Sequence, residues 1–429
     1  MSLRSTIRTI PFLSFLLVVG TSSGQTSRPF SMSSTGIQAY PNQTSIYQNA
    51  LANFPAVLSD ADVLTIFPEY LGIPFDSFAT SANPSPTDPW TVQMTALANA
   101  AVATGRPLMM EIVLTRDFPV AKAVNNNGTL QLQTNWAPTC MDFTSSQFAS
   151  VGTAYVNYAD WIAKTFAPKY LVLMIENNLY YVLCGGNTPS WQALVNIERN
   201  AYDSLKAQFP SMLVFPSFKL EDLYDQTLTG FDSAEYVAMA NLKRDRFGIA
   251  TYPFGVQVTP GDFANPYQLP SDYLLRVRDR YPAEFPVVIT ETGWNSSSIA
   301  ISYNSACYAN LVYSDPSFEA AYMDLLIYSG YVGNFDLISW WSDRDLIVSS
   351  YSNACVVQAT PPSFPECNAD PWCIAINNAR AQAPNGWSPA FAELAFKVFG
   401  TMGLRDYNGN AKPNTLSIWN TFLALPLAH

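Results

Sequence analysis

The chain has 429 residues, a formal net charge of −11 and an isoelectric point near 4.6. Nucleic acids and anionic membrane surfaces require basic patches on their partners, so this acidity argues against both. Aromatic residues make up 14% of the chain and charged residues only 13%, which predicts a large core and rings available to stack on flat ligands such as sugars.

Residues 1–24 combine two early arginines, an apolar run over 10–19 and a series of small residues. This is the pattern of a secretory signal peptide, and the run is too short to span a bilayer. We therefore expect residues 25–429 to form one secreted, extracellular catalytic domain, without a membrane anchor after signal cleavage and monomeric.

Eight segments with strand character follow one another, separated by stretches long enough to hold a helix. They are 35–40, 61–67, 106–115, 169–176, 212–218, 247–252, 286–291 and 335–341. Helical patterns at 90–104 and 146–165 lie between them. The alternation predicts an α/β fold of the (β/α)8 TIM barrel type. A doubly wound open sheet is the alternative, but no glycine-rich phosphate loop follows an early strand.

Long insertions follow strands three, seven and eight, at 117–143, 295–316 and 343–387. Loops after strands build the functional face of such a barrel. Six cysteines lie in the loops after strands three, four, seven and eight: Cys140, Cys184, Cys307, Cys355, Cys367 and Cys373.

An even number of cysteines in an exported chain predicts disulfides rather than metal sites or a thiol nucleophile. Cys140 and Cys184 follow neighbouring strands, so we expect them to pair. The other four cysteines allow three pairings, among which we favour Cys307 with Cys355 and the last two with each other. Three N-x-S/T triplets, at Asn42, Asn127 and Asn295, fit an exported chain. We expect no glycan on Asn295.

The only histidine is His429. A single histidine at the last residue argues against histidine-dependent triads and histidine-ligated metals, so we expect acid–base chemistry to fall to carboxylates, Tyr or Lys. No metal or organic cofactor is implied.

Two of the apolar strands end in a glutamate, Glu176 in the fourth strand and Glu291 in the seventh. Because alternate residues of a strand share a face, we expect Glu176 on the face of Met174 and Glu291 on the face of Ile289, both pointing to the barrel axis. Two carboxylates at one rim are what glycosidase chemistry needs. The plainer alternative is that each acid caps a helix or pairs with an arginine.

The segment 290–294, Thr-Glu-Thr-Gly-Trp, resembles the nucleophile motif of the clan A retaining glycoside hydrolases, in particular of endo-β-1,4-galactanases and β-1,3-glucanases. Members of this clan place an acid/base Glu after strand four and a nucleophile Glu after strand seven. The resemblance implies that Glu291 is the nucleophile and Glu176 the acid/base. Trp294, which ends the motif, is a candidate substrate contact.

The resemblance extends along the chain. Tyr252 follows strand six, where many members keep a Tyr that donates to the nucleophile. Trp340 and Trp341 end strand eight, where the clan commonly sets an aromatic floor under the sugar. The segment 403–413 is similar to the turn that leads into the closing helix of such barrels.

The sequence also departs from the clan pattern. Ile175 precedes Glu176 where the clan usually has Asn, and Asn177 and Asn178 follow it. One of these two asparagines is expected to contact the sugar's 2-hydroxyl in place of the missing Asn. The alternative is a sugar that is substituted or oriented differently at its second carbon. The usual Arg after strand two is absent, and Glu69 stands there as a rival carboxylate and a candidate substrate contact.

Three further acids have open roles. Glu111, inside strand three, is predicted either to pair with a buried basic residue or to line the site. Asp343 and Asp345 are expected to hold the loop after strand eight through local hydrogen bonds.

The resemblance implies a secreted retaining glycoside hydrolase that cleaves β-linked polysaccharide, of the galactan or β-glucan type, by a two-glutamate double displacement. Its partner would be a polysaccharide or oligosaccharide substrate. The alternatives are a secreted carbohydrate-binding barrel without catalysis, and a transglycosylase that remodels wall polymer with the same two acids.

Overall fold

The computed structural model of the chain describes residues 27–35, 46–68, 72–114, 122–126, 129–133, 140–224, 233–255, 257–259, 262–263, 265–280, 286–303, 306–354, 394 and 397–428. Within these ranges no helix is both long and apolar enough to cross a membrane. The predicted signal peptide and the triplets at Asn42 and Asn127 lie outside the described residues.

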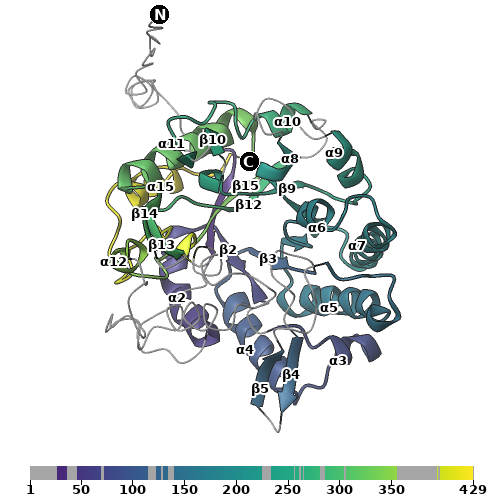
Figure 1. Cartoon of the computed structure of the whole chain (residues 1–429). Coiled ribbons are helices and arrows are strands. Elements are labelled where there is room, and N and C mark those ends of the chain that lie inside the picture. Colours follow the sequence, from purple (N-terminus) through teal and green to yellow (C-terminus); the bar gives the residue numbers. More distant parts are fainter. Residues whose placement is uncertain are drawn as a thin grey trace, which may run out of the picture.

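A parallel sheet of nine strands forms the centre of the molecule, with helices around it (Figure 1). The strand order is β7-β6-β3-β2-β1-β15-β12-β9-β8. The bounds are β1 Ser31–Thr35, β2 Val63–Ile66, β3 Leu108–Ile112, β6 Tyr170–Leu173, β7 Leu213–Phe215, β8 Ser217–Lys219, β9 Phe247–Thr251, β12 Val287–Thr292 and β15 Leu337–Trp340. Only Pro216 separates β7 from β8, so these are two halves of one strand. The order therefore closes into a barrel with eight strand positions, and the predicted (β/α)8 fold is confirmed.

The split in the fifth strand follows from proline chemistry. Pro216 has no backbone N–H, so β7 pairs with β6 before it and β8 pairs with β9 after it. The neighbouring strand approaches this break closely at Gly248, where a Cβ would lie 2.6 Å from the Pro216 carbonyl oxygen. Only glycine allows that approach.

The helices begin with a recurrent local signal. Asp88, Thr188 and Asp315 each cap a helix with the side chain and are each followed by proline at the first helical position. The helix bounds are α2 Ile46–Asp60, α3 Phe75–Thr80, α4 Pro89–Ala103, η2 Ser146–Phe148, α5 Val151–Phe166, α6 Asn178–Leu183, α7 Pro189–Gln208, α8 Leu220–Leu223, α9 Ser233–Met239, η3 Pro253–Gly255, α10 Arg276–Arg280, α11 Pro316–Gly333, α12 Ser349–Ser352 and α15 Thr415–Leu423. Both predicted helices are present, at α4 and α5.

Two apolar clusters fill the structure. The larger contains the buried helix residues and the outward face of the sheet. The smaller is the barrel interior, because its buried members come from the sheet strands and the residues just beyond them: Val63, Met109, Val113, Tyr170, Val172, Ile175, Phe215, Val288 and Leu337. This division shows which way each strand residue points.

A polar layer interrupts the barrel interior. The Ser33 hydroxyl donates to the Val63 carbonyl at 2.7 Å and lies 2.6 Å from the Thr65 hydroxyl, which is 3.3 Å from that of Ser339. The first strand is Ser31–Thr35, so its predicted position at 35–40 is wrong. The prediction relied on runs of apolar residues, and this strand consists mostly of residues with hydroxyl groups. Residues 36–45 lie outside the described residues.

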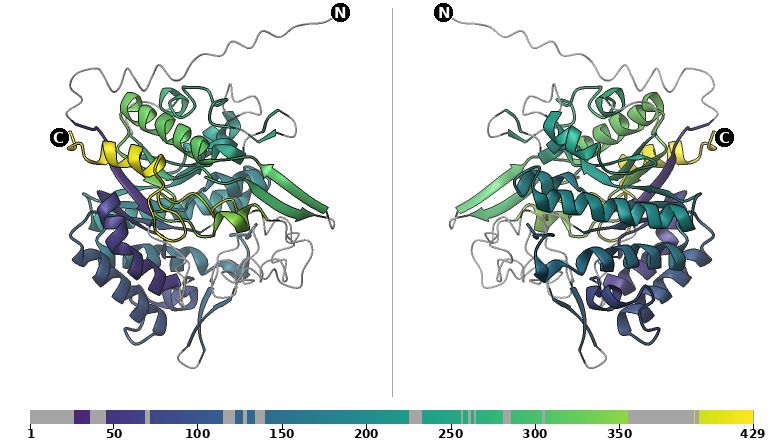
Figure 2. Two further views of the ribbon diagram at one scale, coloured as in Figure 1. Left: turned by 90° about the vertical axis from the view of Figure 1, so that its left-hand side faces the viewer. Right: turned by 90° about the vertical axis from the view of Figure 1, so that its right-hand side faces the viewer.

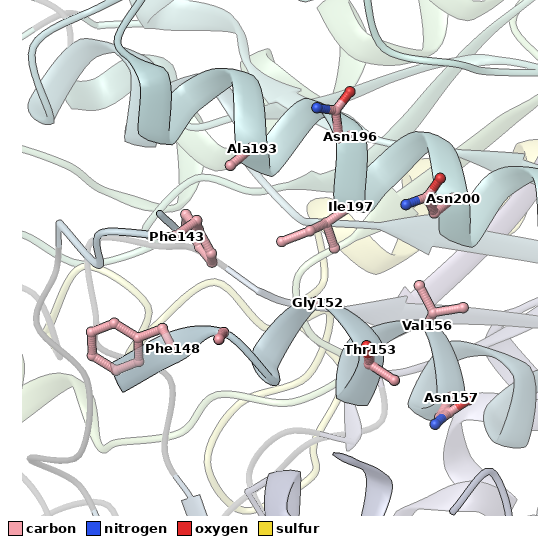
Figure 3. A pocket seen from close by; sticks show the side chains of 11 residues that line it. Phe143, Phe148, Gly152, Thr153, Val156, Asn157, Ala193, Asn196, Ile197 and Asn200 are labelled. Atoms are coloured by element: carbon pink, nitrogen blue, oxygen red, sulfur yellow. The ribbon is translucent and has the colours of Figure 1, made fainter. Parts of the chain in front are cut away.

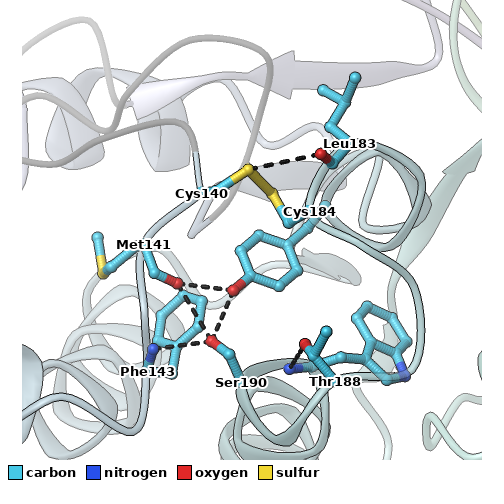
Figure 4. The surroundings of a disulfide bond; sticks show 9 residues. Cys140, Met141, Phe143, Leu183, Cys184, Thr188 and Ser190 are labelled. Atoms are coloured by element: carbon cyan, nitrogen blue, oxygen red, sulfur yellow. Dashed lines mark hydrogen bonds between the residues drawn. A yellow bond between two sulfur atoms is a disulfide. The ribbon is translucent and has the colours of Figure 1, made fainter.

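The disulfide predicted between Cys140 and Cys184 is confirmed, with Cα atoms 5.4 Å apart (Figure 4). Beside it, the Tyr180 hydroxyl donates to the Met141 carbonyl at 2.6 Å, which fixes the loop after strand three against α6. Cys307 is also disulfide-bonded. The other three cysteines lie outside the described residues, so the favoured pairing with Cys355 stays a prediction.

In the described part of the chain, three two-stranded ribbons are inserted after barrel strands. They are β4 Lys122–Asn126 with β5 Thr129–Gln133, β10 Gln257–Thr259 with β11 Asp262–Phe263, and β13 Ile299–Tyr303 with β14 Ala306–Val312. Figure 2 shows the β13–β14 ribbon projecting from the body of the molecule. Most of the third predicted insertion, 355–387, lies outside the described residues.

The segment at Arg28 and the segment after α15 are joined. Arg28 N donates to the Pro426 carbonyl at 2.9 Å, and Ala428 N donates to the Arg28 carbonyl at 2.8 Å. The buried guanidinium of Arg28 also donates to the Leu425 carbonyl at 3.0 Å and forms an ion pair with Asp62. The chain thus enters and leaves the barrel at one place.

A buried ion cluster fixes the turn predicted before the closing helix. The Lys412 ammonium lies 2.6 Å from Asp345 and 3.1 Å from Glu319, and Thr415 donates to Glu319 at 2.7 Å. Burial raises the pKa of Glu319 to about 7 and that of Asp345 to about 6, while the Lys412 charge opposes both shifts. One lysine thus joins α11, the loop after β15 and the start of α15. Asp345 holds its loop through Lys412 and Gly403 N, which lie far along the chain, and not through the local hydrogen bonds that the sequence predicted.

Replacing this lysine tests the cluster. Lys412→Met leaves two buried carboxylates without their cation, so we expect the free energy of unfolding to fall by about 3–5 kcal/mol in urea titrations. Lys243→Met is the control, because Lys243 and its partner Asp203 are partly exposed and such a pair contributes less than about 1 kcal/mol. Equal losses in the two variants would contradict a special role for Lys412.

Candidate active site

Glu291 lies near the carboxyl end of β12, the seventh strand, and is 1% exposed. The Tyr252 hydroxyl, from the residue that follows β9, donates to Glu291 Oε2 at 3.0 Å. A neighbouring strand therefore delivers a donor to this buried carboxylate, which fixes its orientation. A buried acid held in this way is a candidate reactive group.

Simple alternation along β12 does not explain the direction of Glu291, so that expectation is wrong. Ile289 packs in the outer cluster and Val288 in the interior, so simple alternation would turn Glu291 outward. The pairing with β9 shifts between Ile289 and Glu291, where two residues of β12 correspond to one step of β9. This β-bulge brings Glu291 to the inward face, as bulges next to active sites often do.

Glu176 reaches the same edge by a different irregularity. Strand β6 ends at Leu173, and Met174 and Glu176 adopt φ angles of 58° and 49°. Met174 therefore packs in the outer cluster and Ile175 in the interior, so the expected shared face of Met174 and Glu176 within a strand is also wrong. Positive φ is uncommon outside glycine and concentrates at functional sites.

Glu176 is 6% exposed, and its backbone N–H donates to the Ser217 hydroxyl at 3.0 Å. The next N–H, of Asn177, donates to the Ser217 carbonyl at 3.0 Å. Ser217 is the first residue of β8, so the second half of the broken fifth strand fixes the backbone that carries Glu176.

The two asparagines after Glu176 have different environments. Asn178 is tied into the fold, since its amide donates to Lys219 O and to Glu235 at 2.8 Å and accepts from Lys219 N at 2.7 Å. Asn177 is fully buried, and neither polar atom of its amide has a hydrogen-bond partner in the described part of the chain. A buried amide of this kind needs a partner, so Asn177 is the better candidate for a substrate contact.

The three predicted tryptophans also differ in burial and in hydrogen bonding. Trp294 and Trp340 are fully buried, and their indole N–H groups donate to the Ser314 hydroxyl and the Met402 carbonyl. Both rings therefore pack in the core.

Trp341 is 8% exposed, and its indole N–H has no partner among the described residues. Its ring lies 5.6 Å from that of Phe399, which lies 5.1 Å from that of Tyr252. Trp341 is thus the tryptophan linked to the Tyr252–Glu291 pair, and Phe399 joins the site without having been predicted.

Glu221, just after the fifth strand, was also missed. Its Oε1 accepts from the Thr251 hydroxyl at 2.6 Å, Tyr252 N at 2.9 Å and the Tyr273 hydroxyl at 3.0 Å. Its Oε2 is buried and has no partner within the described ranges. Burial raises the pKa of Glu221 above its ordinary value, and the hydrogen bond from Thr251 opposes the shift. Glu221 therefore holds the backbone of the residue that orients Glu291.

Steric crowding explains why the Thr-Glu-Thr-Gly-Trp motif has glycine at position 293. A Cβ on Gly293 would lie 2.8 Å from Met402 Sδ and 3.1 Å from the Trp341 carbonyl oxygen. The chain that follows Glu291 therefore passes directly against the loop after β15, and a larger residue would push the two apart.

The remaining predicted acids are placed as follows. Glu69 lies outside the described residues. Glu111 is buried and shares the inward face of β3 with Met109 and Val113. Asp343 is fully buried, and burial together with the nearby Asp60 carboxylate raises its pKa to about 7. In the described part of the chain, no group of three potential ligands is arranged to hold a metal ion.

Asn295 is 1% exposed, and its amide donates to the Val398 carbonyl at 2.9 Å and accepts from the Thr401 hydroxyl at 3.1 Å. A glycan would require that amide nitrogen to leave the core. The expectation that this residue carries no glycan is thus supported by its packing.

A hollow of about 500 Å³ lies elsewhere, between α5 and α7 (Figure 3). Phe143, Gly152 and Ile197 line it together with asparagines at its borders, and none of its lining residues carries a charge. Its lining residues therefore offer no carboxylate, lysine or tyrosine that could act as an acid or base.

Solved structures share this fold. GH5_18 from Streptomyces cattleya in complex with GlcNAc is 13% identical, with a TM-score of 0.53 over 93% of this chain and 82% of that chain. A GH5_18 variant from Bifidobacterium longum subsp. longum in complex with Manβ1-4GlcNAc is 14% identical, with a TM-score of 0.51 over 92% and 80%. No family model matches the sequence, and no curated protein does. The chain therefore shares the (β/α)8 fold of clan A glycoside hydrolases.

Proposed function

We propose that the protein is a secreted retaining glycoside hydrolase that cleaves β-linked polysaccharide of the galactan or β-glucan type. The observation that carries the proposal is the buried Glu291 carboxylate, held by the Tyr252 hydroxyl at 3.0 Å, at the end of the seventh strand. The position of Glu176 after the fourth strand supplies the second carboxylate. Sugars bound in solved structures of this fold support a saccharide substrate.

In the first step Glu291 attacks the anomeric carbon while Glu176 protonates the glycosidic oxygen, so the leaving sugar departs neutral. In the second step Glu176 takes a proton from water, the water oxygen attacks the anomeric carbon, and the bond to Glu291 breaks. Two inversions retain the β configuration. The Tyr252 hydrogen bond keeps one carboxylate oxygen in place while the other reacts.

A transglycosylase would use the same two acids, with a sugar hydroxyl in place of water in the second step. A carbohydrate-binding barrel without catalysis would show no turnover that depends on Glu291. Release of reducing ends that depends on Glu291 would favour hydrolysis over both alternatives.

Substitution of the two glutamates tests the mechanism. On a panel of β-1,4-galactan and β-glucans, we expect Glu291→Gln and Glu176→Gln each to lower reducing-end release on the order of 10⁴-fold while the circular dichroism spectrum is unchanged. NMR of the first product should show the β anomer. Glu198→Gln is the matched control, because Glu198 is a buried carboxylate on α7 that accepts a hydrogen bond from Lys243 N. Substantial activity in either test variant would remove that residue from its role.

A double-mutant cycle tests the support of Glu291. Tyr252→Phe should lower kcat about tenfold to a hundredfold, because it removes a donor that orients the carboxylate. Glu221→Gln should lower kcat similarly with little change in KM, and the double variant should be no slower than the slower single variant. Additive losses would show that Glu221 does not act through Tyr252.

Replacing Asn177 should affect the reaction rate, whereas replacing Asn178 should affect stability. Asn177→Ala should lower the rate on the order of a hundredfold on normal substrate, and much less on a 2-deoxy substrate, if its amide binds the 2-hydroxyl. Asn178→Ala should instead lower the free energy of unfolding by about 1–3 kcal/mol, because it removes the bonds to Lys219 and Glu235. A full rate in Asn177→Ala would favour a sugar substituted at its second carbon, or the barrel without catalysis.

A further inference from the structure

Two of the most exposed aromatic side chains in the described part of the molecule lie together. Tyr267 is 51% exposed and Tyr313 is 57% exposed. Each packs edge-to-face on Phe318, with ring centroids 5.6 Å and 5.4 Å apart. We call these three residues the aromatic platform.

Hydrogen bonds anchor the backbone at or next to two of the three platform residues, Phe318 and Tyr313. Phe318 lies in the first turn of α11, where Asp315 caps the helix by accepting from Ser317 N at 2.7 Å and from Phe318 N at 3.2 Å. Ser314, next to Tyr313, exchanges two hydrogen bonds with Ser298, of 2.9 Å and 3.0 Å. An anchored backbone at these two residues reduces the entropy that is lost when a ligand stacks on their rings.

The platform is also tied to the segment that carries Glu291. The Ser314 hydroxyl accepts from the Trp294 indole N–H at 3.1 Å and donates to the Asn295 carbonyl. Trp294 is three residues beyond Glu291. The Tyr267 loop follows β9 and its ribbon, and Tyr313 follows β12 and its ribbon, so the platform belongs to the loops on the carboxyl side of the sixth and seventh strands.

The chemistry of the platform suits a neutral sugar chain. A pyranose ring has an apolar face that can stack on a tyrosine, and its hydroxyls can bond at the ring edge. The Tyr313 hydroxyl lies 3.4 Å from the Asp315 carboxylate, which accepts hydrogen bonds and disfavours anionic polymers. The chain's net charge of −11 acts in the same direction.

The platform is too small for a stable protein interface. Two tyrosines, each about half exposed, offer on the order of 200 Å². A standard protein partner covers about 800 Å² on each side. A chain of two or three sugar rings matches the platform better.

We propose that Tyr267, Tyr313 and Phe318 form a surface site that binds a neutral β-linked glycan chain outside the pair Glu176 and Glu291. This inference rests on the proposed function and adds a second place where the polysaccharide binds, apart from the two acids. Stacking on the platform holds a long chain near the two acids, and a short substrate does not reach it.

The test compares long and short substrates. In the double variant Tyr267→Ala, Tyr313→Ala we expect KM for a soluble β-1,3-glucan or β-1,4-galactan to rise about tenfold, with kcat/KM on the trisaccharide of the same linkage unchanged. Tyr328→Ala is the control, because Tyr328 is an exposed tyrosine on α11 outside the platform. An unchanged KM for polymer, or an equal loss on the trisaccharide, would overturn the proposal.

A binding assay separates this inference from the proposed function. Glu291→Gln should be retarded by the same soluble polymer in native affinity gels, and the two tyrosine substitutions should abolish the retardation. If wild type lacks Glu291-dependent turnover, the proposed hydrolase fails, and the gels still decide whether the platform binds glycan. Loss of a dimer in the tyrosine variants, measured by light scattering, would show a protein interface instead and would overturn the glycan site.

Discussion

The close approach of β9 to the break in the fifth strand is the constraint on which the candidate site depends. A Cβ at position 248 would lie 2.6 Å from the Pro216 carbonyl oxygen, so a glycine there lets β9 approach, pair with β8 and complete the barrel. The end of β9 then sets Tyr252, which holds Glu291, and the start of β8 supplies Ser217, which fixes the backbone of Glu176. One proline and one glycine thus govern both candidate acids.

The fold could be predicted from the sequence, but the local backbone geometry that orients the two glutamates could not. Seven of the eight strands were found from their apolar character, and the first was missed because its inward residues are hydroxyls. The bulge before Glu291 and the positive φ angles at Met174 and Glu176 depend on how a strand meets its neighbours. No pattern within one segment contains that information, so alternation placed both acids for the wrong reason.

Side-chain roles were predictable to different degrees. Tyr252 was placed by its order along the chain, and its bond to Glu291 has the expected form. Sequence could not distinguish Trp341 from Trp340, because adjacent residues at a strand end differ only in which side of the barrel they face. Glu221 could have been predicted as a site residue, because it is an acid that follows the carboxyl end of a strand. Phe399 could not have been predicted, because it lies 147 residues after Tyr252 and only the folded chain brings the two rings together.

The junction at Arg28 has a consequence for biogenesis. Strand β1 pairs with β2 on one side and with β15 on the other, and Arg28 bonds to a carbonyl 397 residues away. During synthesis one edge of β1 has no partner until β15 has been made, and an open strand edge is a site for wrong pairing. The sequence of this strand, Ser-Met-Ser-Ser-Thr, has a single apolar side chain, which reduces the tendency of the open edge to pair with another hydrophobic strand. The residues that hid the strand from prediction are therefore suited to protecting the nascent chain from aggregation.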